Sequence, residues 1–278
     1  MSGSFVAGFL AMVAGMIVYA FAYLKYREQD VAILRGFAVA AIVFVLIKVS
    51  FTAWLWNEER IAGKRRQEIE RLVQTDPPFA ALKQYLPEIY KNALHAIDVE
   101  VKTLPADKTV FIHEARGRAP FLLAFDDRLK IASDEAVAAY AAALAGAADE
   151  LGKRDPKLCA VYLYRGLEGR QNFATLLSAP TQKAEAAAMA EIFKSSVAAP
   201  QPRAGSAQDG EIYRILQPVI ADLLKEFGND WQIINSPFAK GVDSAKLCSF
   251  TAAYYREILD LPAADAGLVL RRQLRTHS

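Results

Sequence analysis

Two long apolar runs near the N-terminus constrain this chain more than any other feature. Residues 5–24 contain no acidic or basic side chain, and residues 36–56 contain only Lys48. With a helical rise of about 1.5 Å per residue, each run is long enough to cross the roughly 30 Å hydrocarbon core of a bilayer. We therefore expect a hairpin of two transmembrane helices, with residues 1–56 anchored in the lipid bilayer.

The ends of both runs support this interpretation. Tyrosines collect at the end of the first run and tryptophans, Trp54 and Trp56, at the end of the second. Amphipathic aromatic rings favour the headgroup zone of a membrane. A cleaved signal peptide is the alternative for residues 5–24, but the preceding MSGSF lacks the basic segment of such a peptide. The short connection, residues 25–35, is typical of a helical hairpin.

Two features inside the runs suggest more than anchoring. Ala7, Ala11 and Gly15 are spaced by four and share one helix face, which allows another helix to approach closely. That helix belongs either to the same hairpin or to a second copy of the protein. Lys48 lies deep in the second run, where a charge is costly. Its side chain either extends towards the headgroups or bonds a carbonyl, because neither run holds an acidic partner for an ion path.

A charged segment separates the anchor from the rest of the chain. Residues 57–75 mix acidic and basic side chains and predict a juxtamembrane helix or stalk. Asp76-Pro77-Pro78 ends this pattern, so we assign residues 76–278 to a soluble domain.

Helical spacing of apolar residues dominates this soluble domain. Ser133, Asp155 and Asp243 each precede a helical pattern and are suited to N-capping. We expect Gly152 and Gly228 to end helices, and Pro218 to lie near the first turn of a helix that starts at Ile212. The segment 109–112 is the best strand candidate, and one lone strand forms no sheet. The predicted fold class is all-α, with two N-terminal transmembrane helices and a multi-helix orthogonal bundle.

The chain has two cysteines, Cys159 and Cys248, in matched contexts. Each follows a Lys-Leu pair and an N-capping aspartate, so both fall in the first turns of helices that can meet. An even cysteine count outside the cytoplasm indicates a disulfide. Two buried free thiols, or thiols with a redox or nucleophilic role, are the alternatives. A metal site is disfavoured because no histidine is nearby in the sequence.

Two signals disagree about which side of the membrane the domain occupies. The connection 25–35 holds three basic residues and the segment 57–75 holds five, which places the domain in the cytoplasm by the positive-inside rule. The cysteine pair favours an oxidising compartment instead, and therefore the periplasm.

No catalytic motif stands out. The chain lacks His-Glu-x-x-His, a Gly-x-Ser-x-Gly elbow and a glycine-rich phosphate loop. His113 and Glu114 with Asp126 and Asp127 could act as a base and acids, but surface or capping roles are the ordinary interpretation. The formal net charge of +2, without a basic and aromatic cluster, argues against nucleic acid. We expect no catalytic residue, metal ion or cofactor.

Aromatic residues crowd the regions around both cysteines. Aromatic side chains at helical spacing ordinarily belong to a core. The alternative is a groove for a peptide or lipid. The candidate groove residues are Tyr162, Tyr164, Trp231, Tyr254 and Tyr255.

Residues 133–165 and 241–261 are similar to a group of uncharacterised bacterial inner-membrane proteins. Members of this group have an N-terminal hydrophobic hairpin and a helical C-terminal domain with cysteines at comparable places. The resemblance implies this architecture and a bacterial envelope setting, and it favours the disulfide. It implies no activity.

Together these patterns favour a membrane-anchored helical interaction or scaffold protein that is not an enzyme and that binds a protein partner or itself. One alternative is a membrane-tethered hydrolase or thiol oxidoreductase, which needs a cleft with at least two perturbed ionisable groups. The other is a small transporter or channel subunit, which needs Lys48 to face a pore.

Overall fold

The computed structural model describes residues 29–103, 119–164, 173–203 and 208–274. The first apolar run with Ala7, Ala11 and Gly15 lies outside these ranges, as do the segment 109–112 and the pair His113 and Glu114. The chain divides into two units, Met1–Gly63 and Lys64–Ser278. We describe each unit by itself.

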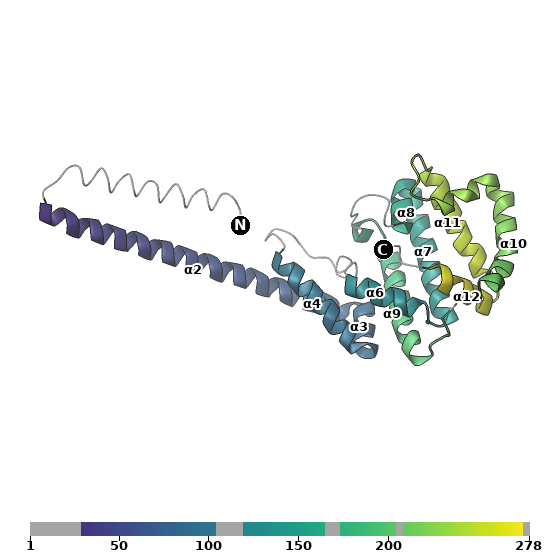
Figure 1. Cartoon of the computed structure of the whole chain (residues 1–278), viewed down its shortest axis with the longest axis horizontal. Coiled ribbons are helices and arrows are strands. Elements are labelled where there is room, and N and C mark those ends of the chain that lie inside the picture. The colour runs from purple at the N-terminus through teal and green to yellow at the C-terminus, as the bar shows by residue number, and fades with distance from the viewer. Residues whose placement is uncertain (1–28, 104–118, 165–172, 204–207, 275–278) are drawn as a thin grey trace. The chain divides into compact units, whose positions relative to one another are not determined.

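The described part of the first unit belongs to helix α2, Gln29–Thr75, which continues into the second unit. The predicted span 36–56 is helical throughout (Figure 1). Large apolar side chains on α2 are exposed, including Phe44 at 66%, Val49 at 60% and Trp56 at 71%. The side chains of residues 29–42 lie outside the described set. Among the residues that are described, no helix is both long and apolar enough for a membrane crossing.

Lys48 is exposed on α2. Its backbone carbonyl accepts a hydrogen bond from the Thr52 hydroxyl at 2.7 Å. A bond of this kind, from a side chain to the carbonyl four residues earlier, satisfies the hydroxyl within the helix.

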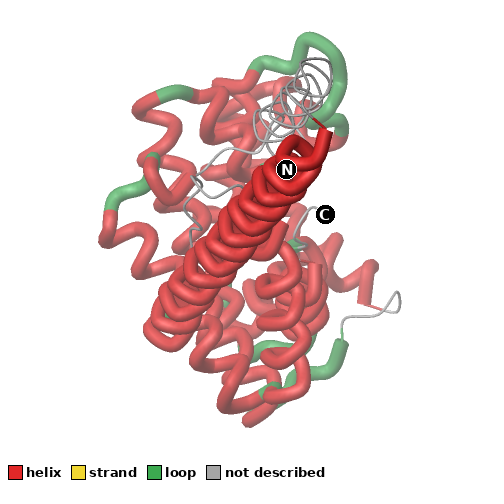
Figure 2. Tube along the Cα trace, turned by 90° about the vertical axis from the view of Figure 1, so that its left-hand side faces the viewer, coloured by secondary structure: helices red, strands yellow, loops and turns green. Residues whose placement is uncertain are grey.

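The second unit is a bundle of short helices, shown in red in Figure 2. No strand occurs in the described ranges, so the predictions of an all-α fold and a multi-helix bundle are confirmed. Its helices after α2 are α3 (Pro77–Tyr85), α4 (Pro87–Thr103), α6 (Ala119–Leu129), α7 (Asp134–Arg154), α8 (Pro156–Leu163), α9 (Ala179–Ala198), α10 (Asp209–Phe227), α11 (Ser244–Leu259) and α12 (Ala263–Gln273), with the short 3₁₀ segments η1 (Phe173–Thr175) and η3 (Gly228–Asn235).

Helix α7 is central to this unit and packs against α8, α9, α11 and α12. As predicted, Ser133 caps its start, because the hydroxyl accepts a hydrogen bond from the Ala136 amide at 3.3 Å. Asp134 and Glu135 in the first turn favour the positive end of the helix dipole. The buried face of α7 is rich in alanine, so neighbouring helices can approach its backbone closely.

The core continues to the end of α2. Ile69 and Val73 are buried in the same cluster as Phe121, Phe125 and Phe193. The three phenylalanine rings meet edge to face, with centroids 5.5 Å and 5.7 Å apart for the two pairs that include Phe193. Part of the predicted stalk, from Lys64 onward, therefore belongs to the compact unit.

Two predicted helix details are wrong. Helix α7 does not end at Gly152 but continues to Arg154, and Asp155 caps its C-terminus. Pro218 lies in the interior of α10, which begins at Asp209 rather than near Ile212. Pro218 is exposed, and it donates no backbone hydrogen bond within the helix. Gly228, with a φ of +59°, ends α10 as predicted.

Glu150 of α7 holds the start of α9. Its carboxylate accepts hydrogen bonds from the Thr181 hydroxyl at 2.6 Å and from the Ser178 hydroxyl at 2.9 Å. The hydrogen bond from Thr181 is the main reason that the pKa of Glu150 lies below its usual value, and the bonds from Ser178 lower this pKa further. Because the pKa is lower in the folded state, the stabilisation is present above the unfolded pKa and is lost as pH falls through the folded one.

We therefore expect Glu150→Gln to be less stable than the wild type at pH 7, with a deficit that shrinks as the pH falls below about 4. Urea unfolding at a series of pH values measures this difference. Glu191→Gln is the matched control, because Glu191 on α9 forms an exposed pair with Lys194 at 3.0 Å, and such pairs contribute little. A deficit of equal size at every pH would contradict the prediction.

Candidate functional site

Cys159 of α8 and Cys248 of α11 form a disulfide, with their Cα atoms 5.7 Å apart. Asp155 and Asp243 cap the starts of α8 and α11, so each cysteine lies in the first turns of its helix. Asp155 accepts a hydrogen bond from the Lys157 amide at 2.8 Å, and Asp243 accepts one from the Ala245 amide at 2.9 Å. The predicted disulfide is confirmed, and both cysteines are buried.

Gly152 lies beside this bond. A Cβ atom at Gly152 would lie 3.1 Å from Sγ of Cys248 and 3.9 Å from Cβ of Cys159. The position is therefore glycine because the disulfide lies against the backbone of α7.

Gly152→Ala is expected to lower the free energy of unfolding by about 1 kcal/mol, since the extra methyl group crowds the sulfur of Cys248. In a Cys159→Ala, Cys248→Ala background the sulfur is gone, so the same change should no longer destabilise the protein. Urea unfolding of the wild type, Gly152→Ala, the double alanine variant and the variant with all three changes gives the coupling energy between Gly152 and the disulfide. Equal effects of Gly152→Ala in both backgrounds would refute this explanation of the glycine.

The described candidate groove tyrosines have the contacts of core side chains. Tyr162, Tyr164 and Tyr254 are buried, and Tyr255 is partly buried. The hydroxyl groups of Tyr164 and Thr251 are hydrogen-bonded at 3.0 Å. Burial raises the pKa of Tyr164, Tyr254 and Tyr255. These contacts support the core interpretation. The fifth candidate, Trp231, belongs to η3, and its side chain lies outside the described set.

Of the four residues that could act as a base and acids, Asp126 and Asp127 lie within the described ranges. Asp126 and Asp127 lie on α6, and Asp127 forms an ion pair with Arg203 at 2.6 Å. Across the described ranges, no three His, Cys, Asp or Glu side chains are placed to hold a metal ion.

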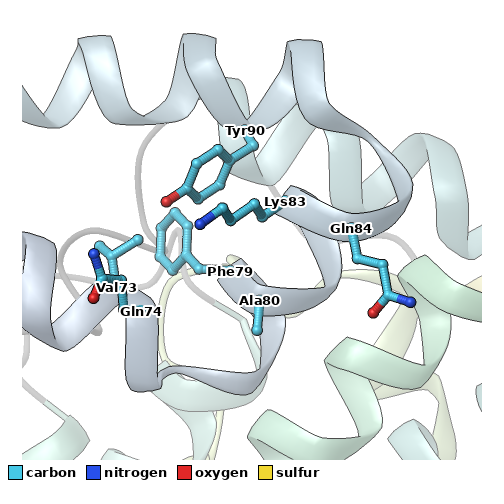
Figure 3. Close-up of a pocket in the computed structure, with 7 residues that line it drawn as sticks. All are labelled: Val73, Gln74, Phe79, Ala80, Lys83, Gln84 and Tyr90. Atoms are coloured by element: carbon cyan, nitrogen blue, oxygen red, sulfur yellow. The ribbon is translucent and has the colours of Figure 1, made fainter.

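A pocket of about 650 Å³ lies where α2, α3 and α4 meet (Figure 3). We call it the α3 pocket, because α3 provides most of its lining. The lining residues are Val73 and Gln74 of α2, Phe79, Ala80, Lys83 and Gln84 of α3, and Tyr90 of α4. Its volume falls within the range of small-molecule sites, about 300 to 1,000 Å³.

Prolines create the turns that surround the α3 pocket. Only Asp76 separates the end of α2 from Pro77, the first residue of α3, and only Leu86 separates α3 from Pro87, the first residue of α4. Proline suits the first turn of a helix and restricts the residue before it, so the chain bends sharply at both places. Three helices thereby meet within a few turns of one another.

Apolar and polar groups occupy different parts of the α3 pocket. Val73 and Phe79 are almost completely buried, whereas Lys83 is exposed. The Lys83 ammonium group and the Tyr90 hydroxyl lie beside the Phe79 ring, whereas the side chain of Gln84 lies well apart from that ring (Figure 3). Burial, and then the negative charge of Glu70, raise the pKa of Tyr90. Tyr90 is therefore a neutral hydrogen-bond donor at neutral pH.

No pattern in the sequence predicted the α3 pocket. One local signal was Asp76-Pro77-Pro78, which was interpreted only as a domain boundary, and Pro87 was not singled out. Comparison with protein-family models, curated proteins and solved structures found no match to this chain.

Proposed function

We propose that this protein is a membrane-anchored helical interaction module of the bacterial inner membrane. In this proposal, the hairpin of residues 5–24 and 36–56 holds the compact unit at the periplasmic face. The protein acts by binding a protein partner or a second copy rather than by catalysis. The observation that carries the proposal is the buried Cys159–Cys248 disulfide in a chain with two apolar runs near its N-terminus.

The composition of α2 supports the anchor. Its run 36–56 carries one ionisable residue, Lys48, and Phe44, Val49 and Trp56 are exposed on the helix. Large apolar side chains that are exposed together on one helix indicate a surface that contacts a membrane or another protein. In the proposal, this surface contacts the lipid bilayer. The resemblance of residues 133–165 and 241–261 to inner-membrane proteins agrees with it.

The disulfide supports the periplasmic side. Disulfides persist in oxidising compartments and are rare where thiol reductants are abundant. The basic residues of segment 57–75 favour the opposite orientation. That rule is weaker for long domains, which are translocated largely regardless of their charge. We therefore give more weight to the disulfide.

The anchor has a direct test. After alkaline carbonate extraction of isolated membranes, the protein is expected in the pellet with integral membrane proteins. A variant with Val43→Asp, Phe44→Asp and Val49→Asp, from which residues 5–24 are also removed, should be released to a large extent, because one span is absent and each acidic residue within the other costs about 3 kcal/mol. Recovery of the wild-type protein in the supernatant would refute the anchor.

The interaction has a separate test. A photo-crosslinking amino acid is placed, one position at a time, at Leu123, Tyr213 and Phe238, which are 66%, 64% and 55% exposed. We expect a specific adduct in living cells from at least one position, and none from Phe193, which is fully buried. Recovery of a monomer in mild detergent, with no adduct from any of the three, would contradict an interaction module.

A further inference from the structure

We propose that Lys48 pairs, within the bilayer, with an acidic residue in a transmembrane helix of a different protein. This inference rests on the proposed membrane anchor, and it names the kind of partner that the anchor binds. The partner helix packs on one face of α2, which we call the Lys48 face. Its members, all in the first unit, are Phe44, Lys48, Phe51 and Leu55.

The Lys48 face has the spacing of a helix–helix contact. Its members follow one another at intervals of four, three and four residues. Side chains at these intervals pack into a neighbouring helix in coiled coils, and most bundles of transmembrane helices have a similar geometry. Phe44, Phe51 and Leu55 are 66%, 48% and 42% exposed, and α2 is unbroken through this stretch (Figure 1). The face is therefore apolar around a single cation.

Lys48 lies close to the middle of the proposed span. Residue 46 is the centre of the run 36–56, and Lys48 is two residues beyond it. Along the helix axis, Trp56 is about 12 Å from Lys48, and the other end of the run is about 18 Å from it. A helical side chain is directed towards the N-terminus of its helix, which is the more distant end. The four-carbon stem of lysine covers only part of that distance, so the ammonium group stays in the hydrocarbon.

The chain's own sequence offers no counter-charge at this depth. Neither apolar run contains an acidic residue. The acidic residues of α2 nearest to Lys48 in sequence, Asp30 and Glu58, are about 27 Å and 15 Å away along the axis. Carbonyl groups inside a helix already accept bonds from amides, and that of Lys48 also accepts the Thr52 hydroxyl at 2.7 Å. Since intramembrane charges occur in pairs, the acid comes from another chain.

A second copy of this chain would not supply the acid. It would bring the same two runs, which hold no acidic residue. A symmetric contact through the Lys48 face would also place two ammonium groups close together, where a low dielectric constant strengthens their repulsion. Charge complementarity therefore selects a different protein, whose transmembrane helix carries Asp or Glu near its centre.

The test uses the full-length protein in phosphatidylcholine nanodiscs, and the probe is a leucine-rich transmembrane peptide with one aspartate at its centre. Energy transfer from a donor on the protein to an acceptor on the peptide measures association. We expect the aspartate peptide to bind about tenfold more tightly than the same peptide with leucine at that place. Lys48→Leu should bring the two peptides level. Lys64→Leu is the matched control, because Lys64 is exposed on α2 beyond the apolar run, and it should keep the tenfold preference.

Exchanging the charges gives a second control. Lys48→Asp should prefer a peptide with a central lysine to the aspartate peptide. Absence of this reversal, or a preference for aspartate that persists in Lys48→Leu, would overturn the proposal. Energy transfer between wild-type copies that Lys48→Leu weakens would also overturn it, because a second copy would then be the occupant.

Failure of the anchor and failure of this inference give different results. A chain that does not enter the nanodiscs would refute the anchor, and this inference with it. A wild-type chain that enters them but binds the aspartate and leucine peptides equally would refute this inference alone.

Discussion

Replacing both Cys159 and Cys248 with alanine is expected to lower the free energy of unfolding of the compact unit by about 4 kcal/mol. The bond closes a loop between residues 89 positions apart, so its loss restores a large amount of chain entropy to the unfolded state. A unit of this size should then unfold about 10 °C lower. Differential scanning calorimetry of the full chain in detergent measures the shift.

The control separates the bond from the side chains. Reduced wild-type protein, in which both sulfur atoms remain, should lose nearly the same stability as the Cys159→Ala, Cys248→Ala variant. The alanine variant loses slightly more because two buried sulfur atoms are missing from the core. A melting temperature within about 2 °C of the oxidised wild type would show that the disulfide adds little, contrary to the chain-entropy estimate.

Gly267→Ala is expected to destabilise the compact unit by about 3 kcal/mol, because a Cβ on Gly267 would overlap the carboxylate of Asp134. The same Cβ would lie 2.7 Å from the Cβ of Asp134. That carboxylate forms an ion pair with Arg271, whose side chain is only 7% exposed. Either α12 moves away from α7, or Asp134 turns from Arg271 and leaves a buried charge unpaired.

The chain offers a matched glycine for comparison. A Cβ on Gly146, in the middle of α7, would meet no atom within 4 Å. Gly146→Ala should therefore stabilise the protein by about 0.5 to 1 kcal/mol through helix propensity alone. Urea unfolding compares both variants with the wild type. Equal stability of Gly146→Ala and Gly267→Ala would show that α12 does not approach Asp134 as closely as described.

Local signals predicted the helix starts well. Ser133, Asp155 and Asp243 cap helices because a short polar side chain can bond the free amides of a first turn without any tertiary contact. The matched aspartate-to-cysteine contexts extended this reasoning to the disulfide, since a cap four or five residues before each cysteine places both sulfur atoms in the first turns of their helices.

Tertiary contacts explain what the sequence did not reveal. Gly152 has the local appearance of a helix stop, but it is required by a sulfur atom of a cysteine in another helix. Asp134 and Arg271 form a pair although they are 137 positions apart in the sequence. Helical periodicity relates only residues within the same helix, so it could not predict this pair. The α3 pocket depends on how three helices meet, so its lining residues could not be grouped before the fold was known.

The redox state of Cys159 and Cys248 in living cells tests the central claim most directly. Cells are quenched in acid, denatured and labelled with one thiol reagent, then reduced and labelled with a second, and both cysteines are scored by mass spectrometry. We predict that both carry only the second label, as a disulfide in an oxidising compartment requires. If both carry the first label, the cysteines are thiols in the cell, and the periplasmic assignment of the compact unit is wrong.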